Sequence, residues 1–221
     1  MRTQPPEKIA LQVAKAGVES LRPRLLGEPP VLPLVPRRSD YDLNPHLQPA
    51  MPRELAPAAV LVPIVRRGDP TVLFTRRTEH LARHAGQVSF PGGRMHANDR
   101  SLVATALRET QEETGIDEKF ITVAGFLDAY ETGTGFAILP VIGLVDPGFS
   151  LEPNPHEVAE IFEVPLAHLL DRANCGRDSR PWRGQTRAFH AFNYGRHTIW
   201  GATAAILVNL RDRLCGAEID R

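Results

Sequence analysis

The placement of proline most constrains how this chain can fold. Thirteen of its twenty prolines lie within the first 70 of its 221 residues. Because a proline donates no backbone hydrogen bond and fixes one backbone torsion, it is rare inside helices and central strands. We therefore expect residues 1–57 to form an N-terminal helix, at Glu7–Leu21, followed by a proline-rich extended arm on the surface. Residues 58–221 are expected to form the folded domain.

The composition limits the class of protein. Twenty-six lysines and arginines balance 26 aspartates and glutamates, so no strong field draws the chain to nucleic acid or to an anionic membrane. No apolar run approaches the ~20 residues of a membrane helix, and two cysteines without a disulfide pattern suit a reducing compartment. We expect a cytoplasmic protein that binds neither nucleic acid nor membrane. A homodimer, with the arm packed on a second copy, is left open.

Segments typical of strands and helices alternate irregularly after the arm. Residues 58–65 and 71–76 flank a turn and indicate a hairpin of two strands. Further strand-like segments lie at 88–90, 120–128, 137–144, 156–164 and 196–200, and helical segments at 165–170 and 202–214. This order predicts an α/β fold with a mixed β-sheet and helices on its faces.

The helix expected at Ser101–Thr114 has recognisable end signals. Asn98 or Asp99 can accept a backbone N–H at its start, and Gly115 can end it in a left-handed conformation. Two glycines, Gly92 and Gly93, precede this helix. Paired glycines alone usually mark a turn, but they also permit close backbone approach and expose N–H groups that can contact phosphate oxygens.

Three glutamates give this helix an acidic face. Glu109, Glu112 and Glu113 lie three and four residues apart, so their carboxylates share one side of a helix. Like charges at that spacing repel one another by about 0.2–0.5 kcal/mol per pair. A divalent cation would offset the repulsion, because Mg²⁺ prefers carboxylate oxygen. For the glutamates taken alone, a solvated acidic face is the alternative.

Together these residues resemble the Nudix box. That signature is Gly, five residues, Glu, seven residues, Arg-Glu, apolar, any residue, Glu-Glu, any residue, Gly, apolar. The chain matches it with Gly93, Asp99, Arg108-Glu109, Glu112-Glu113 and Gly115-Ile116. It departs from it because Asp99 replaces Glu, eight residues separate Asp99 from Arg108, and Thr110 takes an apolar position. The resemblance implies a Nudix-type α/β/α sandwich and a pyrophosphatase, an enzyme that hydrolyses phosphoanhydrides.

A second motif is similar to the signature of the coenzyme A pyrophosphatase branch. It consists of Leu73–Thr78 followed by Gly86–Gly93, and the resemblance extends over roughly residues 60–214. This branch implies a small nucleotide substrate, coenzyme A in free, acylated or oxidised form. Hydrolysis of its diphosphate bond gives 3′,5′-ADP and 4′-phosphopantetheine.

The resemblance also implies roles for the acidic residues. Glu109, Glu112 and Glu113 are the expected ligands of Mg²⁺ or Mn²⁺, with Glu113 as the strongest single assignment. Either Glu112 or Glu157 is the expected general base that takes a proton from water. For Glu157 an exposed acid at the end of a strand is the alternative. Arg108 is expected to orient a glutamate through a salt bridge.

The substrate contacts that the resemblance implies are cations and the glycine loop. Guanidinium groups bind phosphate with two hydrogen bonds, which suits the 3′-phosphate of coenzyme A. For each arginine a surface salt bridge is the alternative. The residues expected to bind substrate are Arg76, Arg77, Arg83, Gln87, Gly92 and Gly93.

Two other functions compete with coenzyme A hydrolysis. The first is hydrolysis of another nucleoside diphosphate derivative, such as NADH or ADP-ribose. The second is a non-catalytic module of the same fold that senses nucleotides. Such a module would be expected to have lost carboxylates, and here Glu109, Glu112 and Glu113 are all present.

Overall fold

A computed structural model of the chain describes residues 5–16, 18–80, 85–182 and 184–215. Its α-helices are α1 (Pro6–Ala16), α2 (Val18–Leu21), α3 (Leu102–Thr114), α4 (Leu166–Leu170) and α5 (Ala202–Cys215). Its strands are β1 (Arg38–Ser39), β2 (Ala56–Val65), β3 (Thr71–Arg77), β4 (Val88–Ser89), β5 (Gly92–Arg94), β6 (Ile121–Phe126), β7 (Tyr130–Glu131), β8 (Phe136–Val145), β9 (Val158–Pro165), β10 (Cys175–Trp182), β11 (Gln185–Tyr194) and β12 (His197–Trp200). None of the helices in these ranges is long and apolar enough to cross a membrane.

The main sheet is mixed, and its central hairpin opens toward one end. β2 lies parallel to β8 over its whole length, whereas β3 is antiparallel to β9. The predicted hairpin of β2 and β3 is confirmed, but the two strands pair only at Ile64–Val72 and Val65–Thr71, next to the turn. Beyond those pairs, β3 continues against β4 and β2 against β5. The glycine segment is therefore held between the diverging ends of two core strands.

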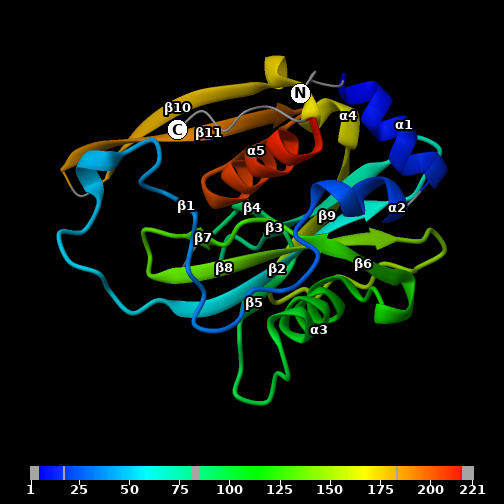
Figure 1. The fold of residues 1–221 in the computed structure, drawn as a ribbon, viewed down its shortest axis with the longest axis horizontal. Helices are drawn as coiled ribbons and strands as arrows, with labels where there is room; N and C mark the ends of the chain where they lie inside the picture. Colours follow the sequence, from blue (N-terminus) through cyan, green and yellow to red (C-terminus); the bar gives the residue numbers. More distant parts are fainter. Residues whose placement is uncertain (1–4, 17, 81–84, 183, 216–221) are drawn as a thin grey trace.

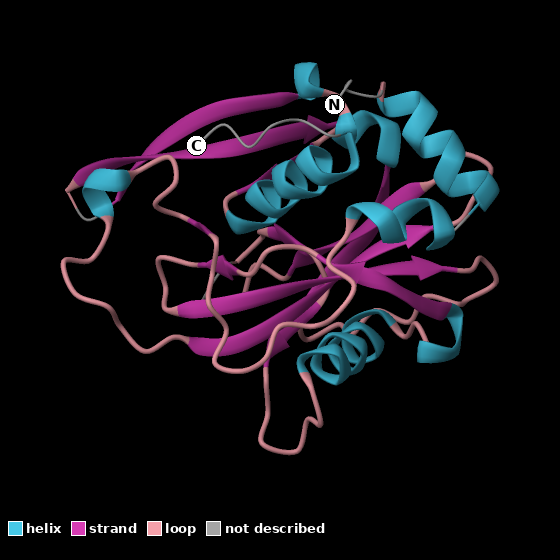
Figure 2. Cartoon of the chain, in the orientation of Figure 1, coloured by secondary structure: helices cyan, strands magenta, loops and turns pink. Residues whose placement is uncertain are grey.

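Helices cover both faces of this sheet (Figures 1 and 2). Alternate residues of a strand point to opposite faces, and β2 shows this clearly. Ala59 and Leu61 lie in the apolar cluster that includes Leu102 and Ala106 of α3. Val62 and Ile64 lie in the larger cluster with α1, α4 and α5. The predicted α/β/α architecture with a mixed sheet is confirmed.

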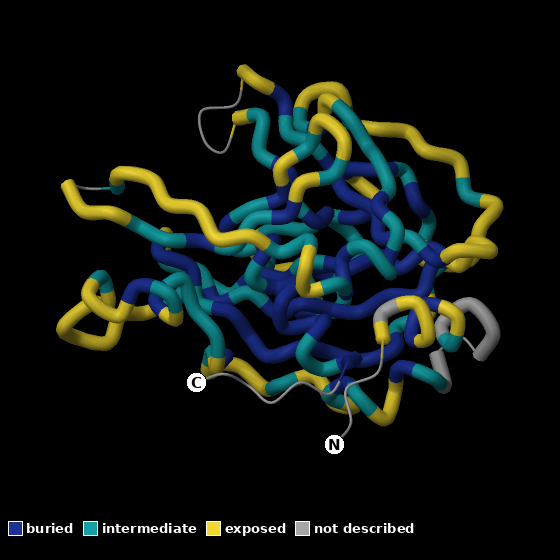
Figure 3. Tube along the Cα trace, turned by 90° about the horizontal axis from the view of Figure 1, so that it is seen from above, coloured by how far each residue is buried: buried dark blue, intermediate teal, exposed yellow. Residues whose placement is uncertain are grey.

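A second sheet, β10–β11–β12, was predicted only at its last strand. β10 and β11 form a long antiparallel hairpin that passes above α5 in Figure 1. Most of β10 is exposed, and the hairpin projects from the molecule in Figure 3. Because β10 buries no alternating apolar residues, its sequence lacks the pattern that identifies a half-buried strand.

The N-terminal segment packs on its own chain. The helix expected at Glu7–Leu21 is present as α1 and α2. The following arm is largely irregular, as expected, but it is not merely laid on the surface. Leu25, Leu34 and Tyr41 are buried, and β1 pairs in parallel with β7. The division at residue 57 and the packing of the arm on a second copy stay predictions.

A buried aspartate joins the main sheet to α5. The Asp128 carboxylate accepts hydrogen bonds from Asn209 Nδ2 at 3.0 Å and from Arg213 Nη2 at 2.7 Å. Burial raises the pKa of Asp128, but the hydrogen bonds from Arg213 and Asn209 outweigh burial and hold the pKa below its ordinary value. The stabilisation is therefore present above the unfolded pKa of about 4 and is lost as the pH falls below it.

We expect Asp128→Ala to lower the free energy of unfolding by about 2 kcal/mol at pH 7, because charge-assisted hydrogen bonds are lost. Urea denaturation measures this change, and the difference from the wild type should shrink below about pH 4. Asp146→Ala is the control, since Asp146 forms an exposed ion pair with Arg66 and should cost less than about 1 kcal/mol. Equal losses in the two variants would contradict the prediction.

Candidate active site

Helix α3 is fixed at both ends by local hydrogen bonds. Ser101 Oγ accepts the Ala104 N–H at 3.1 Å, so Ser101 is the N-terminal cap. The prediction that Asn98 or Asp99 caps the helix was wrong, because both residues precede the cap. The prediction for the other end is confirmed, since Gly115 is left-handed with φ of 78°. One face of α3 packs on the sheet, with Glu113 against β3 and Glu109 against β5.

Arg108 gathers three carboxylates around one guanidinium. Its Nε and Nη2 donate to Asp99 at 2.9 and 3.0 Å, while Nη1 lies 2.9 Å from Glu109 and 3.0 Å from Glu112. The Glu112 carboxylate is thus directed at Arg108 and is mostly exposed. Arg108 therefore ion-pairs with two of the three predicted metal ligands and holds Glu112 apart from the third, Glu113.

Asp99 anchors this arrangement. Its carboxylate also accepts the His96 N–H at 2.8 Å and the Thr105 hydroxyl at 3.0 Å. The hydrogen bond from Arg108 is the largest of the effects that hold the pKa of Asp99 well below its usual range. Sequence reasoning left the role of Asp99 open because it departs from the Nudix signature. The signal was nevertheless present, because Asp99 is an acid at the signature's Glu position and the signature arginine, Arg108, follows it.

Glu113 is the most enclosed of the three glutamates. It is 3% exposed, and it accepts hydrogen bonds from Thr75 Oγ1 of β3 at 3.3 Å and from the backbone N–H of Gly92. Burial raises the pKa of Glu113 to about 8; the Gly92 N–H and the charge of Arg77 oppose this, and the charges of Glu109 and Glu157 add to it. Glu109 and Glu157 are therefore close enough to act on Glu113.

The acidic residues fit a divalent cation in donor chemistry. Glu109, Glu113 and Glu157 supply only oxygen donors, which Mg²⁺ and Mn²⁺ prefer. As the side chains lie, no three acidic, histidine or cysteine residues among those described are close enough to share a metal ion. Glu112 would have to leave Arg108 to join Glu109 and Glu113. The predicted convergence of all three glutamates is therefore incomplete in this structure.

The glycine loop contacts these acids at close range. A Cβ atom on Gly93 would lie 2.6 Å from Cδ and Oε1 of Glu109. A Cβ atom on Gly92 would lie 2.4 Å from the carbonyl oxygen of Ala59. Real Cβ atoms do not approach backbone so closely, so Gly92 has to be glycine, whereas a side chain at Gly93 would displace the Glu109 carboxylate.

A cavity of about 770 Å³ opens beside the loop. This volume falls within the range of small-molecule sites. Four of the residues predicted to bind substrate line it, namely Arg77, Gln87, Gly92 and Gly93. Sequence reasoning missed the other lining residues, which include Arg94, Thr132, Thr134, Phe136, Thr203 and Ile206. They come from three separate segments, and no local pattern links them.

The neighbouring arginines of β3 have different surroundings. Arg77 lines the cavity and acts on Glu113. Arg76 does not line it, because its side chain pairs with Glu160 and Glu79, each at 3.3 Å. The surface salt bridge that was the alternative therefore describes Arg76. The third predicted arginine, Arg83, lies outside the described residues.

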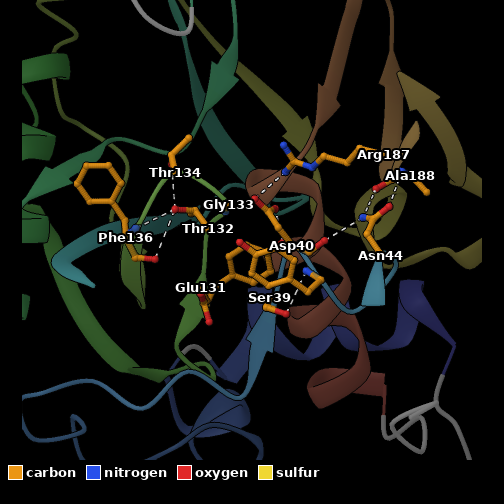
Figure 4. A network of polar contacts seen from close by, with 12 residues as sticks. Ser39, Asp40, Asn44, Glu131, Thr132, Gly133, Thr134, Phe136, Arg187 and Ala188 are labelled. Carbon is orange, nitrogen blue, oxygen red and sulfur yellow. Dashed lines mark hydrogen bonds and ion pairs between the residues drawn. The ribbon is translucent and has the colours of Figure 1, made fainter. Parts of the chain in front are cut away.

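The arm supports the turn that forms one wall of the cavity (Figure 4). Asp40 accepts the Gly133 N–H at 2.6 Å and the Tyr130 hydroxyl at 2.8 Å. Arg53 donates to the carbonyl oxygens of Thr132 at 2.6 Å and Gly133 at 3.2 Å. Two arm residues thus hold the backbone beside Thr132 and Thr134, and no local sequence pattern predicted that the arm lies near the site.

Comparison with known proteins gives one consistent family. Residues 55–182 match the family described as NUDIX domain. A protein of Photorhabdus laumondii named "Uncharacterized Nudix hydrolase NudL" is 43% identical over 71% of this chain and 84% of its own length. A protein of the same name from Enterobacter sp. is 38% identical over 74% of this chain and 87% of its own length.

Solved structures are more distantly similar. The Nudix hydrolase RenU of M. Smegmatis aligns with 76% of this chain and 90% of its own, at 17% identity and a TM-score of 0.48. The NUDIX domain of Shewanella oneidensis NrtR, a complex with ADP ribose, aligns with 59% of this chain and 84% of its own, at 22% identity and a TM-score of 0.40.

We expect Gly93→Ala to lower the rate of diphosphate hydrolysis by about 100-fold, because the added methyl displaces the Glu109 carboxylate. Steady-state kinetics on any diphosphate substrate that the wild type cleaves gives the rate, and thermal unfolding checks that the fold is kept. Gly68→Ala is the control, since a Cβ atom at that turn would meet nothing within 4 Å. An unchanged rate in Gly93→Ala would show that the close approach to Glu109 is dispensable.

Proposed function

The chain belongs to the Nudix hydrolase family, and from this membership we propose that it hydrolyses the diphosphate bond of coenzyme A. The products are 3′,5′-ADP and 4′-phosphopantetheine, and Mg²⁺ or Mn²⁺ is the cofactor. The observation that carries the proposal is the position of the second motif. Arg77, Gln87 and the Gly92–Gly93 pair, which resemble the coenzyme A branch, line one cavity beside the Nudix helix.

The diphosphate is proposed to lie against the glycine loop. This loop lines the cavity on one side and contacts Glu109 and Glu113 on the other. Arg77 lies close enough to act on Glu113, so its guanidinium can also neutralise a phosphate placed there. A diphosphate bound at this point would have its phosphoanhydride bond between the Arg77 guanidinium and the acidic residues.

Glu109 and Glu113 are the proposed principal ligands of the cation, with Glu112 as the third. A divalent ion held there supplies neutralisation of the diphosphate charge and a bound water of lowered pKa. Arg108 positions Glu109 through their ion pair. Asp99 in turn fixes Arg108, so the geometry of the ligands rests on a side chain that touches neither metal nor substrate.

Glu157 is proposed as the general base in preference to Glu112. The charge of Glu157 raises the pKa of Glu113, which supports a position for Glu157 near the acidic residues. Its backbone is held by the Thr78 N–H, which donates to the Glu157 carbonyl oxygen at 3.0 Å. Glu112 is instead paired with Arg108 and faces solvent. A base must lie within reach of the attacking water, and we assign that role to Glu157 because Glu112 is committed to Arg108.

The 3′-phosphate of coenzyme A is proposed to contact Arg94. This residue lines the cavity and is exposed at its edge. Arg76, which was also a candidate, is paired with two glutamates. Apolar residues on the far wall, Phe136 and Ile206, suit a ring or an aliphatic chain. The cavity therefore offers both charged and apolar surface, as a nucleotide with a pantetheine arm requires.

Replacing Glu113 by Gln should lower coenzyme A turnover by about a thousandfold, because several kcal/mol of charge stabilisation would be lost with a metal ligand. Product analysis by chromatography and mass spectrometry, with Mg²⁺ or Mn²⁺ present, measures the turnover. EDTA should abolish wild-type turnover as well. Glu118→Gln, an exposed residue just beyond the helix, is the matched control. Full activity in Glu113→Gln would rule out the assignment of this ligand.

Coenzyme A should be preferred over dephospho-coenzyme A by about tenfold in KM, since one charge-assisted contact is worth roughly 1.5–3 kcal/mol. Arg94→Gln should remove this preference, whereas Arg76→Gln should keep it. The same assay, run with NADH and ADP-ribose, compares the competing substrates. Faster cleavage of ADP-ribose or NADH than of coenzyme A would assign the chain to another branch, and no cleavage of any of them would favour a sensing module.

A further inference from the structure

A second cavity lies apart from the glycine loop. It encloses about 150 Å³ between the arm, the β10–β11 hairpin and α5. Its α5 residues include Ala205 and Val208, whereas Ala202 and Ile206 of the same helix line the cavity beside the glycine loop. The two cavities thus use different residues of one helix. Five arginines line the smaller one, namely Arg38, Arg172, Arg177, Arg187 and Arg211.

The aspartates of this cavity leave positive charge uncompensated. Three line it: Asp40, Asp42 and Asp212. Arg187 pairs with Asp40 at 2.6 Å, and Asp212 is shared by Arg38 at 3.5 Å and Arg211 at 3.3 Å.

The remaining two arginines, Arg172 and Arg177, form no ion pair with any carboxylate in the described ranges. Both are exposed and lie at the rim. Five guanidinium groups against three carboxylates give this small cavity an excess of two positive charges.

Arg211 lacks a full set of partners. It is only 9% exposed, and within the described chain its Nε is buried without a hydrogen-bond partner. Its ion pair with Asp212 is made by Nη2. A buried guanidinium that leaves a donor unused is rare, because each unpaired buried polar group is costly. This Nε is itself closed to solvent, so it marks an incompletely satisfied guanidinium, and a ligand in the cavity would contact the group through its other nitrogens.

The surroundings of His190 report the same positive potential. His190 lies opposite Arg177 in the β10–β11 register and lines the cavity. Burial is the main cause that lowers the pKa of His190, and the charges of Arg177, Arg211 and Arg38 lower it further, against the opposing charge of Asp212. The imidazole is therefore neutral at pH 7 and can donate one hydrogen bond and accept another.

We propose that this cavity is a binding site for a phosphate dianion, held by Arg211 within and by Arg177 and Arg172 at the rim. Arginine is suited to this role because its planar group donates two parallel hydrogen bonds to phosphate oxygens. The volume accommodates one phosphate group but not a nucleoside. The ligand is accordingly inorganic phosphate or the phosphate end of a larger molecule whose remainder lies outside. The proposal does not depend on the substrate of the Nudix site.

Isothermal titration calorimetry of the full chain with inorganic phosphate tests this site. EDTA in the buffer removes metal that could hold phosphate at the glutamates, and constant ionic strength separates binding from screening. The wild type should bind one phosphate, and Arg177→Gln should weaken binding by about tenfold, as expected for one charge-assisted contact. Arg66→Gln is the charge-matched control, since Arg66 pairs with Asp146 elsewhere on the surface, and it should bind as the wild type does.

Arg211→Gln should abolish binding, and Arg177→Gln keeps the test valid if that buried change unfolds the protein. A parallel titration with 5′-AMP distinguishes the sources of the ligand. The proposal is supported if the wild type binds phosphate, 5′-AMP or both, and if Arg177→Gln weakens that binding. The proposal is overturned if the wild type shows no saturable binding, if Arg177→Gln binds both ligands as the wild type does, or if Arg77→Gln alone removes binding.

Discussion

The buried carboxylate of Glu113 connects helix α3, the main sheet and the glycine loop. Glu113 accepts hydrogen bonds from Thr75 on β3 and from the backbone of Gly92, so α3, a core strand and the loop meet at one group. Burying an acid without compensation is unfavourable. The hydrogen bonds from Thr75 and Gly92 and the positive charge of Arg77 partly offset this cost. The same burial that makes Glu113 hard to ionise alone favours a positively charged ligand beside it.

Local sequence patterns predicted the parts of the fold that depend on local physics. The C-terminal end of α3 follows from a left-handed Gly115, and the β2–β3 hairpin follows from two apolar runs around a turn. The N-terminal cap did not follow in the same way, since it is Ser101 and not the predicted Asn98 or Asp99. The β10–β11 hairpin escaped prediction because β10 is exposed along most of its length. Its partners, α5 and the arm, are brought to it only by the tertiary fold.

In the site, too, local sequence patterns predicted some features, and others depend on the tertiary fold. The motif placed Gly92, Gly93 and the glutamates on neighbouring elements. The structure brings the glycines against Glu113 and Glu109, whereas Glu112 pairs with Arg108. The motif could not tell Arg76 from Arg77, because which neighbour points to the cavity depends on strand pairing and on the irregular register at Arg76–Arg77. Nor could it find Asp40, whose bond to Gly133 spans 93 positions of the chain.

The residues that support the cavity extend beyond the segment of the chain that matches the family. The family match ends at residue 182 and begins at residue 55, yet Arg53, Asp40 and α5 all lie beyond those limits. The cavity beside the glycine loop is thus completed by flanking segments that lie outside the range of the family match. A change in either flank would therefore reshape this cavity without altering any residue that the family match covers.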